Sequence, residues 1–171
     1  MRRFSGLWLM AQRNASGGIR VYVAFRGPLD WHEGIGPADT EAVRARLLGM
    51  YEGFDDSLLD LMRHNDGAFT NQPVFVLPVP HTWNRVPGIT LLGDAAHLMP
   101  PAGDGANLAM LDGAEPARNI VGQPTIDDAV AAYENVMMPR SIDQAAATAE
   151  ILATLIPDSD STEPDFPGAP G

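Results

Sequence analysis

"GDAAHLMPPAGDGANLAMLDGAE" occupies residues 93–115 and places one carboxylate, Asp94, between a strand-like run and a helix-like run. The preceding residues 89–92 are almost all apolar, a pattern typical of a short strand buried on both faces of a parallel sheet. Ligands of open α/β sheets bind beyond the carboxyl ends of the strands, so Asp94 lies where a ligand is expected. Gly93 contributes no side chain at this point, and the Asp94 carboxylate can accept hydrogen bonds from hydroxyl groups.

The loop that follows brings bare main chain toward the same point. Pro101, the second of a proline pair, stiffens the loop, while Gly103 and Gly105 let the backbone approach a flat or phosphorylated ligand without a Cβ in the way. A helix is predicted from Gly105 or Ala106 to about Val121. Its first free N–H groups and the positive end of its dipole favour an anion or an electron-rich ring edge. The expected ligand is polyhydroxylated and able to carry negative charge.

Upstream of this stretch, the sequence predicts sheet followed by two short helices. An apolar segment and an alternating segment flank turn residues that tolerate positive φ, which is the pattern of a β-hairpin. A helix capped by Asp39 or Thr40 and a second helix follow, and a segment flanked by prolines is typical of an edge strand. The expected elements are strands at 6–11 and 19–25 around a turn at 14–18, a helix from residue 40, a helix at 55–64 and a strand at 73–77.

Downstream, one more helix is predicted before the chain loses its apolar pattern. The sequence TIDD at 125–128 resembles a capping box, and the apolar spacing after it predicts a helix that continues to about Leu155. Pro139 is expected to kink or restart this helix. Residues 157–171 have too little apolar surface to offset their ordering entropy, so we expect a disordered acidic tail.

Composition excludes several classes of function. The 22 acidic and 11 basic residues give a formal net charge of −11, which argues against nucleic acid as a partner because phosphate binding needs clustered Lys and Arg. Cysteine is absent, so neither a disulfide framework nor a thiolate metal site is available. The apolar patch at residues 6–10 is too short for a signal-peptide core or a membrane span. These features favour a cytoplasmic protein.

The longer stretch "ITLLGDAAHLMPPAGDGANLAMLDGAE", residues 89–115, resembles the second flavin-binding motif of the FAD-dependent aromatic-hydroxylase group of monooxygenases. This group includes salicylate-hydroxylase-like, ubiquinone-pathway and tetracycline-modifying enzymes. The tetracycline-modifying branch is the most similar, because a "W…R" segment at 83–85 precedes the motif and a "YE" pair at 133–134 follows it. The resemblance implies that Asp94, after Gly93, binds the ribityl chain of FAD. It also implies contacts with the isoalloxazine ring from Pro101, Gly103, Gly105, Ala106 and Asn107.

The resemblance implies a mixed α+β fold of the α/β type: part of an FAD-binding Rossmann-like domain together with part of a substrate-side β-sheet. Residues 1–80 correspond to the sheet and two short helices, residues 81–156 to the C-terminal part of the FAD-binding domain, and residues 157–171 to the tail. The family's N-terminal βαβ unit with its G-x-G-x-x-G pattern, which holds the ADP half of FAD, has no counterpart in the sequence. The chain therefore looks like a fragment of an enzyme.

The implied reaction is NADPH- or NADH-dependent hydroxylation of an aromatic or otherwise electron-rich small molecule. No side chain is identified as a general acid or base. A separate N-terminal dinucleotide-binding chain is the expected partner of a split enzyme. The alternative is an inactive remnant, or a subunit that only docks to such a chain.

Individual residues carry alternative interpretations. His97 and Asp94 could belong to a metal-dependent hydrolase, but His97 is interpreted as a structural residue packed under the loop, and no metal site is expected. Asp104 favours the helix dipole or is simply solvated. Arg140 is interpreted as a surface or interdomain ion-pair residue. A stripe interpreted as core contains Leu108, Leu111 and Ala114.

Overall fold

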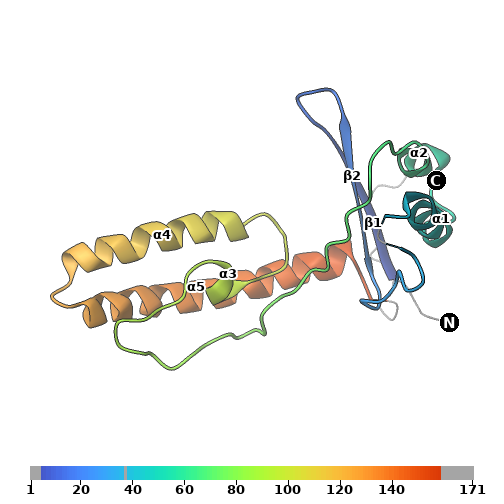
Figure 1. Cartoon of the computed structure of the whole chain (residues 1–171). Helices are drawn as coiled ribbons and strands as arrows, with labels where there is room; N and C mark the ends of the chain where they lie inside the picture. The colour runs from blue at the N-terminus through green and yellow to red at the C-terminus, as the bar shows by residue number, and fades with distance from the viewer. Residues whose placement is uncertain (1–4, 37, 159–171) are drawn as a thin grey trace, which may run out of the picture. The chain divides into compact units, whose positions relative to one another are not determined.

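A computed structural model describes residues 5–36 and 38–158 of the chain. These residues form a mixed α+β arrangement of one two-stranded antiparallel sheet followed by five helices (Figure 1), so the expected mixed class is confirmed. The elements in chain order are β1 (Ser5–Arg13), β2 (Ile19–Arg26), α1 (Thr40–Met50), α2 (Asp56–Arg63), α3 (Asp94–His97), α4 (Gly105–Gly122) and α5 (Ile126–Leu155).

The chain divides into two compact units. The N-terminal unit combines the chain up to Pro73 with the segment from Thr154 onward, and the helical unit is the segment Val74–Ala153. The N-terminal unit contains the sheet with α1 and α2, and the helical unit contains α3, α4 and most of α5. The sequence motif at 93–115 therefore belongs entirely to the helical unit.

The β-hairpin of the N-terminal unit forms as predicted from its turn residues. β1 and β2 pair antiparallel, with Arg13 opposite Ile19 and Trp8 opposite Ala24. The turn is closed by a hydrogen bond from Asn14 N–H to the Gly18 carbonyl at 2.9 Å. Glycines in the turn supply the positive φ that tight hairpin connections require, since Gly17 has φ +86°.

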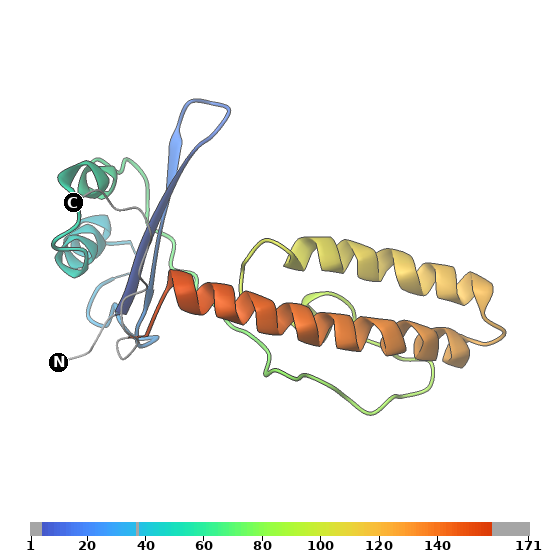
Figure 2. The ribbon, with the colours of Figure 1, turned by 180° about the vertical axis from the view of Figure 1, so that it is seen from behind.

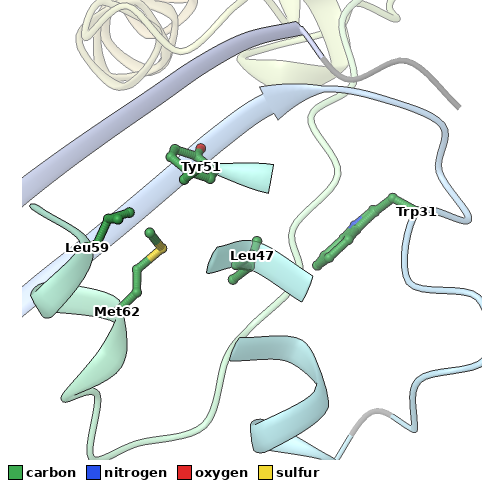
Figure 3. Packing of buried hydrophobic residues seen from close by; sticks show 5 residues of the cluster. All are labelled: Trp31, Leu47, Tyr51, Leu59 and Met62. Carbon is green, nitrogen blue, oxygen red and sulfur yellow. The ribbon is translucent and has the colours of Figure 1, made fainter. Parts of the chain in front are cut away.

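The core of the N-terminal unit lies between the hairpin and the two short helices. Each helix begins at an aspartate N-cap: Asp39 accepts from Ala42 N–H at 3.0 Å and Asp55 from Ser57 N–H at 2.9 Å. Tyr51, which is fully buried, directs its hydroxyl at the sheet, 2.9 Å from the Trp8 carbonyl. The buried cluster, seen in Figure 3, consists of Trp31, Leu47, Tyr51, Leu59 and Met62.

The helical unit is built on two long helices that lie side by side in Figures 1 and 2. The helix predicted to end near Val121 ends one residue later, at Gly122. α5 begins after the predicted capping box, where Asp128 N–H donates to Thr125 Oγ1 at 3.1 Å. The expected restart at Pro139 is wrong, because α5 continues through this residue as one helix. Pro139 is exposed, so water can solvate the carbonyl group that it leaves unpaired.

Two expected strands are absent from the described part of the chain. Residues 73–77 and 89–92 are not strands, and the second segment contributes only an isolated bridge between Val86 and Ile89. Ile89 is 61% exposed, whereas a strand of a parallel sheet is buried on both faces. Strand formation needs neighbouring strands, and the described residues supply none beside these segments. The structure consequently does not show a partial Rossmann-like domain.

The expected acidic tail lies outside the described residues from residue 159 onward. Within residues 5–36 and 38–158, no helix combines the length and the apolar character that crossing a membrane would demand.

Candidate functional site

Asp94 stands at the start of α3, a single helical turn. Gly93 precedes it with φ +55° and ψ −137°, a conformation that side-chain-bearing residues rarely adopt. A Cβ on Gly93 would also lie 3.3 Å from the Ala109 Cβ of α4. The backbone conformation therefore favours glycine here, and a side chain would also have to displace Ala109 slightly. Asp94 itself is exposed, and the described residues include no hydrogen-bond or ion-pair partner of its carboxylate. The carboxylate is available to a ligand.

A buried carboxylate, Asp112 of α4, holds both ends of this turn. Its Oδ2 accepts hydrogen bonds from Gly93 N–H at 2.9 Å and from His97 Nε2 at 2.5 Å. Because an ionised carboxylate can only accept, Nε2 is the protonated nitrogen of His97. Asp112 is 0% exposed and His97 is 4% exposed, so this pair lies beneath the turn. The interpretation of His97 as a structural residue agrees with this geometry.

Arg140 of α5 completes the buried network. Its Nη2 donates to Asp112 Oδ1 at 3.0 Å, and its Nη1 donates to both carboxylate oxygens of Glu115 at 2.8 and 3.0 Å. The hydrogen bond to Glu115 raises the pKa of Arg140 above its already high ordinary value. Arg140 thus connects α5 to α4 as an ion-pair residue, as expected, but both partners belong to the same unit, so the interdomain alternative is wrong.

The glycine-rich loop leads into α4 without a side-chain cap. Gly103 has φ +106°, and no atom lies within 4 Å of the position that a Cβ would take there. Asp104, the N-cap residue, makes no capping hydrogen bond; its Oδ2 accepts instead from Gln144 Nε2 of α5 at 2.6 Å. Asp104 is therefore not merely solvated, and its carboxylate belongs to the residue at the N-terminal end of α4, where negative charge favours the helix dipole. The loop is attached to α5, and the start of α4 is left open.

The first turn of α4 presents free hydrogen-bond donors. In the described part of the chain, no protein acceptor pairs with the N–H groups of Gly105, Ala106 and Asn107, whereas Leu108 N–H is the first to bond within the helix, at 3.0 Å to Asp104 O. A Cβ at Gly105 would meet no atom within 4 Å, so the protein's own packing does not require glycine there. Open space and unpaired donors fit a ligand with acceptor groups.

The segment that precedes the turn is fixed to α5 by a second buried carboxylate. Glu134, 4% exposed, accepts hydrogen bonds from Trp83 Nε1 at 3.0 Å and from Thr90 Oγ1 at 2.9 Å. The neighbouring Tyr133 donates to the Leu91 carbonyl at 3.3 Å. Burial, and secondly the negative charge of Asp112, raise the pKa of Tyr133. The W…R segment at 83–85 and the YE pair at 133–134 noted in the sequence thus meet in space.

Sequence reasoning missed the residues that hold the site together. The stripe expected to be core is largely wrong: Leu111 and Ala114 are exposed, and the buried residue of α4 is Asp112. A signal was present, because Asp112 is the one charged residue between Gly105 and Ala114. The metal hypothesis gains no support, since the described residues contain no group of three or more His, Asp or Glu side chains that could hold an ion.

An apolar cavity of about 340 Å³ lies elsewhere in the helical unit. It is lined by Ile89 and Thr90, by Pro116 and Ile120 near the end of α4, and by side chains of the first two turns of α5. This cavity is separate from the candidate site, because its lining includes neither the turn at 93–97 nor residues 101–112. The cavity exposes apolar surface beside the segment that was expected to be a buried strand.

Comparison with known proteins finds partial relatives. The chain is 40% identical over 91 aligned positions to a protein named Monooxygenase penA from Penicillium thymicola. The aligned region covers 44% of this chain and 21% of that protein. The chain is 34% identical over 79 aligned positions to a chloroplastic zeaxanthin epoxidase from Nicotiana plumbaginifolia, covering 45% of this chain and 12% of the relative. The similarity thus spans about a fifth or less of each relative's length. No family model matches the chain.

Proposed function

We propose that this chain supplies the flavin-contacting turn of an FAD-dependent monooxygenase. Two observations carry the proposal: the exposed carboxylate of Asp94 stands on a turn that the buried Asp112 holds to α4, and the N–H groups at the start of the same helix are unpaired. The partial similarity to a monooxygenase and to an epoxidase supports the same reaction class.

Each residue of the motif has a distinct role in this proposal. The Asp94 carboxylate accepts hydrogen bonds from the ribityl hydroxyls, and Gly93 allows the turn that exposes it. The N–H groups of Gly105, Ala106 and Asn107, with the helix dipole behind them, favour negative charge on the ring. Pro101 stiffens the loop that lies beside the ring, and Gly103 allows its backbone to adopt positive φ. The bound cofactor would supply the redox and oxygen chemistry, with NADPH or NADH as the reductant.

The same proposal predicts weak cofactor binding by the chain alone. The ADP half of FAD needs a phosphate cradle and an acidic residue for its ribose, and the sequence contains no G-x-G-x-x-G pattern to provide them. We therefore propose that a separate dinucleotide-binding chain or segment completes the site. The substrate is a small aromatic or electron-rich molecule, and the sheet of the N-terminal unit is the candidate for the substrate side.

A second candidate function is docking without catalysis. The exposed apolar side chains of residues 74–76 and of Ile89, Leu91 and Leu92 favour it, because they resemble a surface that another polypeptide covers. In this case the chain is an inactive remnant or a subunit that contributes contacts only.

Titration of the full chain with FAD, followed by quenching of flavin fluorescence, tests the first candidate. We expect Asp94→Ala to weaken binding about 10-fold or more, because a hydrogen bond to a charged group contributes about 1.5–3 kcal/mol. Asp143→Ala, an exposed aspartate of α5, is the matched control and should leave affinity unchanged. Equal affinity of the wild type and Asp94→Ala refutes the assignment of Asp94.

If the chain alone shows no quenching, co-expression with a dinucleotide-binding βαβ domain separates the two candidates. Co-purification of yellow FAD that depends on Asp94 supports the split enzyme. A stable complex that never retains FAD supports the docking subunit.

A further inference from the structure

A small, mainly apolar cavity lies between α3 and α5. It measures about 20 Å³, and its lining includes His97 and Ser141 among mainly apolar side chains such as Leu77 and Ile142. His97 and Ser141 are both more than nine-tenths buried, at 4% and 5% exposure. These two side chains are thus buried members of the lining of a partly open cavity.

Two buried polar atoms in this lining have no hydrogen-bond partner within the described chain: His97 Nδ1 and Ser141 Oγ. Leaving a buried polar atom unpaired costs about 1–3 kcal/mol, so such atoms in native proteins are normally satisfied by protein or by water. Since His97 Nε2 donates to Asp112, Nδ1 of neutral His97 is an acceptor and needs a donor.

We propose that this cavity binds one ordered water molecule that bridges His97 Nδ1 and Ser141 Oγ. A water molecule needs about 10–15 Å³ on the same scale of volume and two to four polar partners, so the cavity has room for one. The water donates to His97 Nδ1 and accepts from the Ser141 hydroxyl. His97 Nδ1 and Ser141 Oγ thereby each gain a hydrogen-bond partner.

The bridging water extends the buried network from α5 to the turn by a second route. Arg140 reaches Asp112 directly, while the neighbouring Ser141 reaches His97 through the water. His97 is then held at both ring nitrogens, which fixes its orientation beneath Asp94. The site is independent of any flavin, because its partners all belong to the protein interior.

A Ser–His–Asp nucleophile is the competing interpretation of the same residues. It requires a direct hydrogen bond from the serine hydroxyl to the imidazole and access for a substrate. Ser141 Oγ has no hydrogen-bond partner in the described chain, and Ser141 is buried. The geometry therefore favours a water site over a nucleophile.

Water–protein NOE and ROE spectra of the full isotope-labelled chain test the proposal. We expect cross-peaks of a long-lived water with protons of His97 and Ser141, and long-range ¹H–¹⁵N spectra should show the Nε2–H tautomer of His97. Ala145→Val, which fills the cavity from α5, and Ser141→Ala, which removes one partner, should abolish these cross-peaks.

Thr148→Val is the matched control, because it removes a buried hydroxyl of the same helix that already bonds the Gln144 carbonyl at 3.0 Å. This variant should retain the water signals. Absence of the signals in the wild-type chain overturns the proposal, so the test does not depend on the folding of any variant. Covalent labelling of Ser141 by a fluorophosphonate, or signals that persist in Ala145→Val, also overturns it.

Discussion

At the scale of single residues, Asp112 has the largest expected effect on stability. Its carboxylate is fully buried and accepts from Gly93 N–H, His97 and Arg140. Asp112→Ala leaves the buried donors of Gly93 and His97 without their acceptor and removes one of the two carboxylates that pair with Arg140. Removing one partner of a buried ion pair costs about 3–5 kcal/mol, so we expect a loss of that size in the free energy of unfolding. Urea denaturation followed by circular dichroism measures it.

The control for Asp112 is another aspartate of the same unit. Asp143 is exposed on α5, and its replacement by alanine should change the free energy of unfolding by no more than about 0.5 kcal/mol. An Asp112→Ala variant as stable as Asp143→Ala would show that the buried network does not hold the turn.

Tyr51 makes the stability of the N-terminal unit depend on pH in the alkaline range. Burial raises the pKa of its hydroxyl from 10.0 to about 12, and the Trp8 and Ala24 carbonyls oppose this shift only in part. Between these values the unfolded chain loses the Tyr51 proton and the folded chain keeps it. Stability is therefore fully present below pH 10 and falls as the pH rises toward 12, by up to about 1.4 kcal/mol per pH unit.

Tyr51→Phe should remove this dependence. The variant should lose about 0.5–1.5 kcal/mol at neutral pH, because the hydrogen bonds to the sheet are lost. Its urea midpoint should then decline less than that of the wild type between pH 10 and 12. Tyr22→Phe, at an exposed position of β2, serves as the control. Equal declines in the wild type and Tyr51→Phe would contradict the assignment.

At the scale of secondary-structure elements, the sequence correctly predicted the hairpin and the capped helices, because turn residues and helix caps act within a few residues of the chain. The hairpin follows from its turn residues, and α1, α2 and α5 begin at side-chain caps that are readable in the sequence. The strand expected at 89–92 depends on neighbouring strands, which an apolar run cannot guarantee. Asp112 was missed for the same reason: its burial is decided by partners on α3 and α5 that lie far away in the sequence.

The continuity of α5 through Pro139 leads to a prediction about this helix. Proline lacks the N–H group that would bond the carbonyl of Asn135, and a proline inside a helix costs about 3 kcal/mol relative to alanine. Pro139→Ala should therefore raise the free energy of unfolding by about 1–3 kcal/mol, with part of the cost already relieved by solvation of the exposed turn. Pro124→Ala, in the connection before α5, should give no gain. A destabilised Pro139→Ala would mean that the proline ring makes contacts worth more than the missing hydrogen bond.

At the scale of the whole molecule, the turn at 93–97 has its hydrogen-bond partners, whereas the apolar segments nearby in the sequence lack the strand partners expected for them. The turn, its glycines and the open start of α4 were predictable from the sequence because glycine, proline and a helix start have fixed conformational meanings. The apolar segments at 74–76 and 89–92 carry the composition of buried strands yet are exposed. A surface of this kind favours association with another polypeptide.

The exposed apolar segments should make the chain self-associate when no other partner is present. Phe75 is 60% exposed and Ile89 61% exposed, and neither segment is paired in a sheet of the described residues. Light scattering coupled to gel filtration should show oligomers whose proportion rises with concentration, and Phe75→Lys with Ile89→Lys should shift the chain toward the monomer. Leu29→Lys, at an apolar side chain that is 68% exposed in the N-terminal unit, is the control for added charge. A wild-type chain that stays monomeric at high concentration, or a Leu29→Lys variant that dissociates equally well, would show that these two segments are not the associating surface.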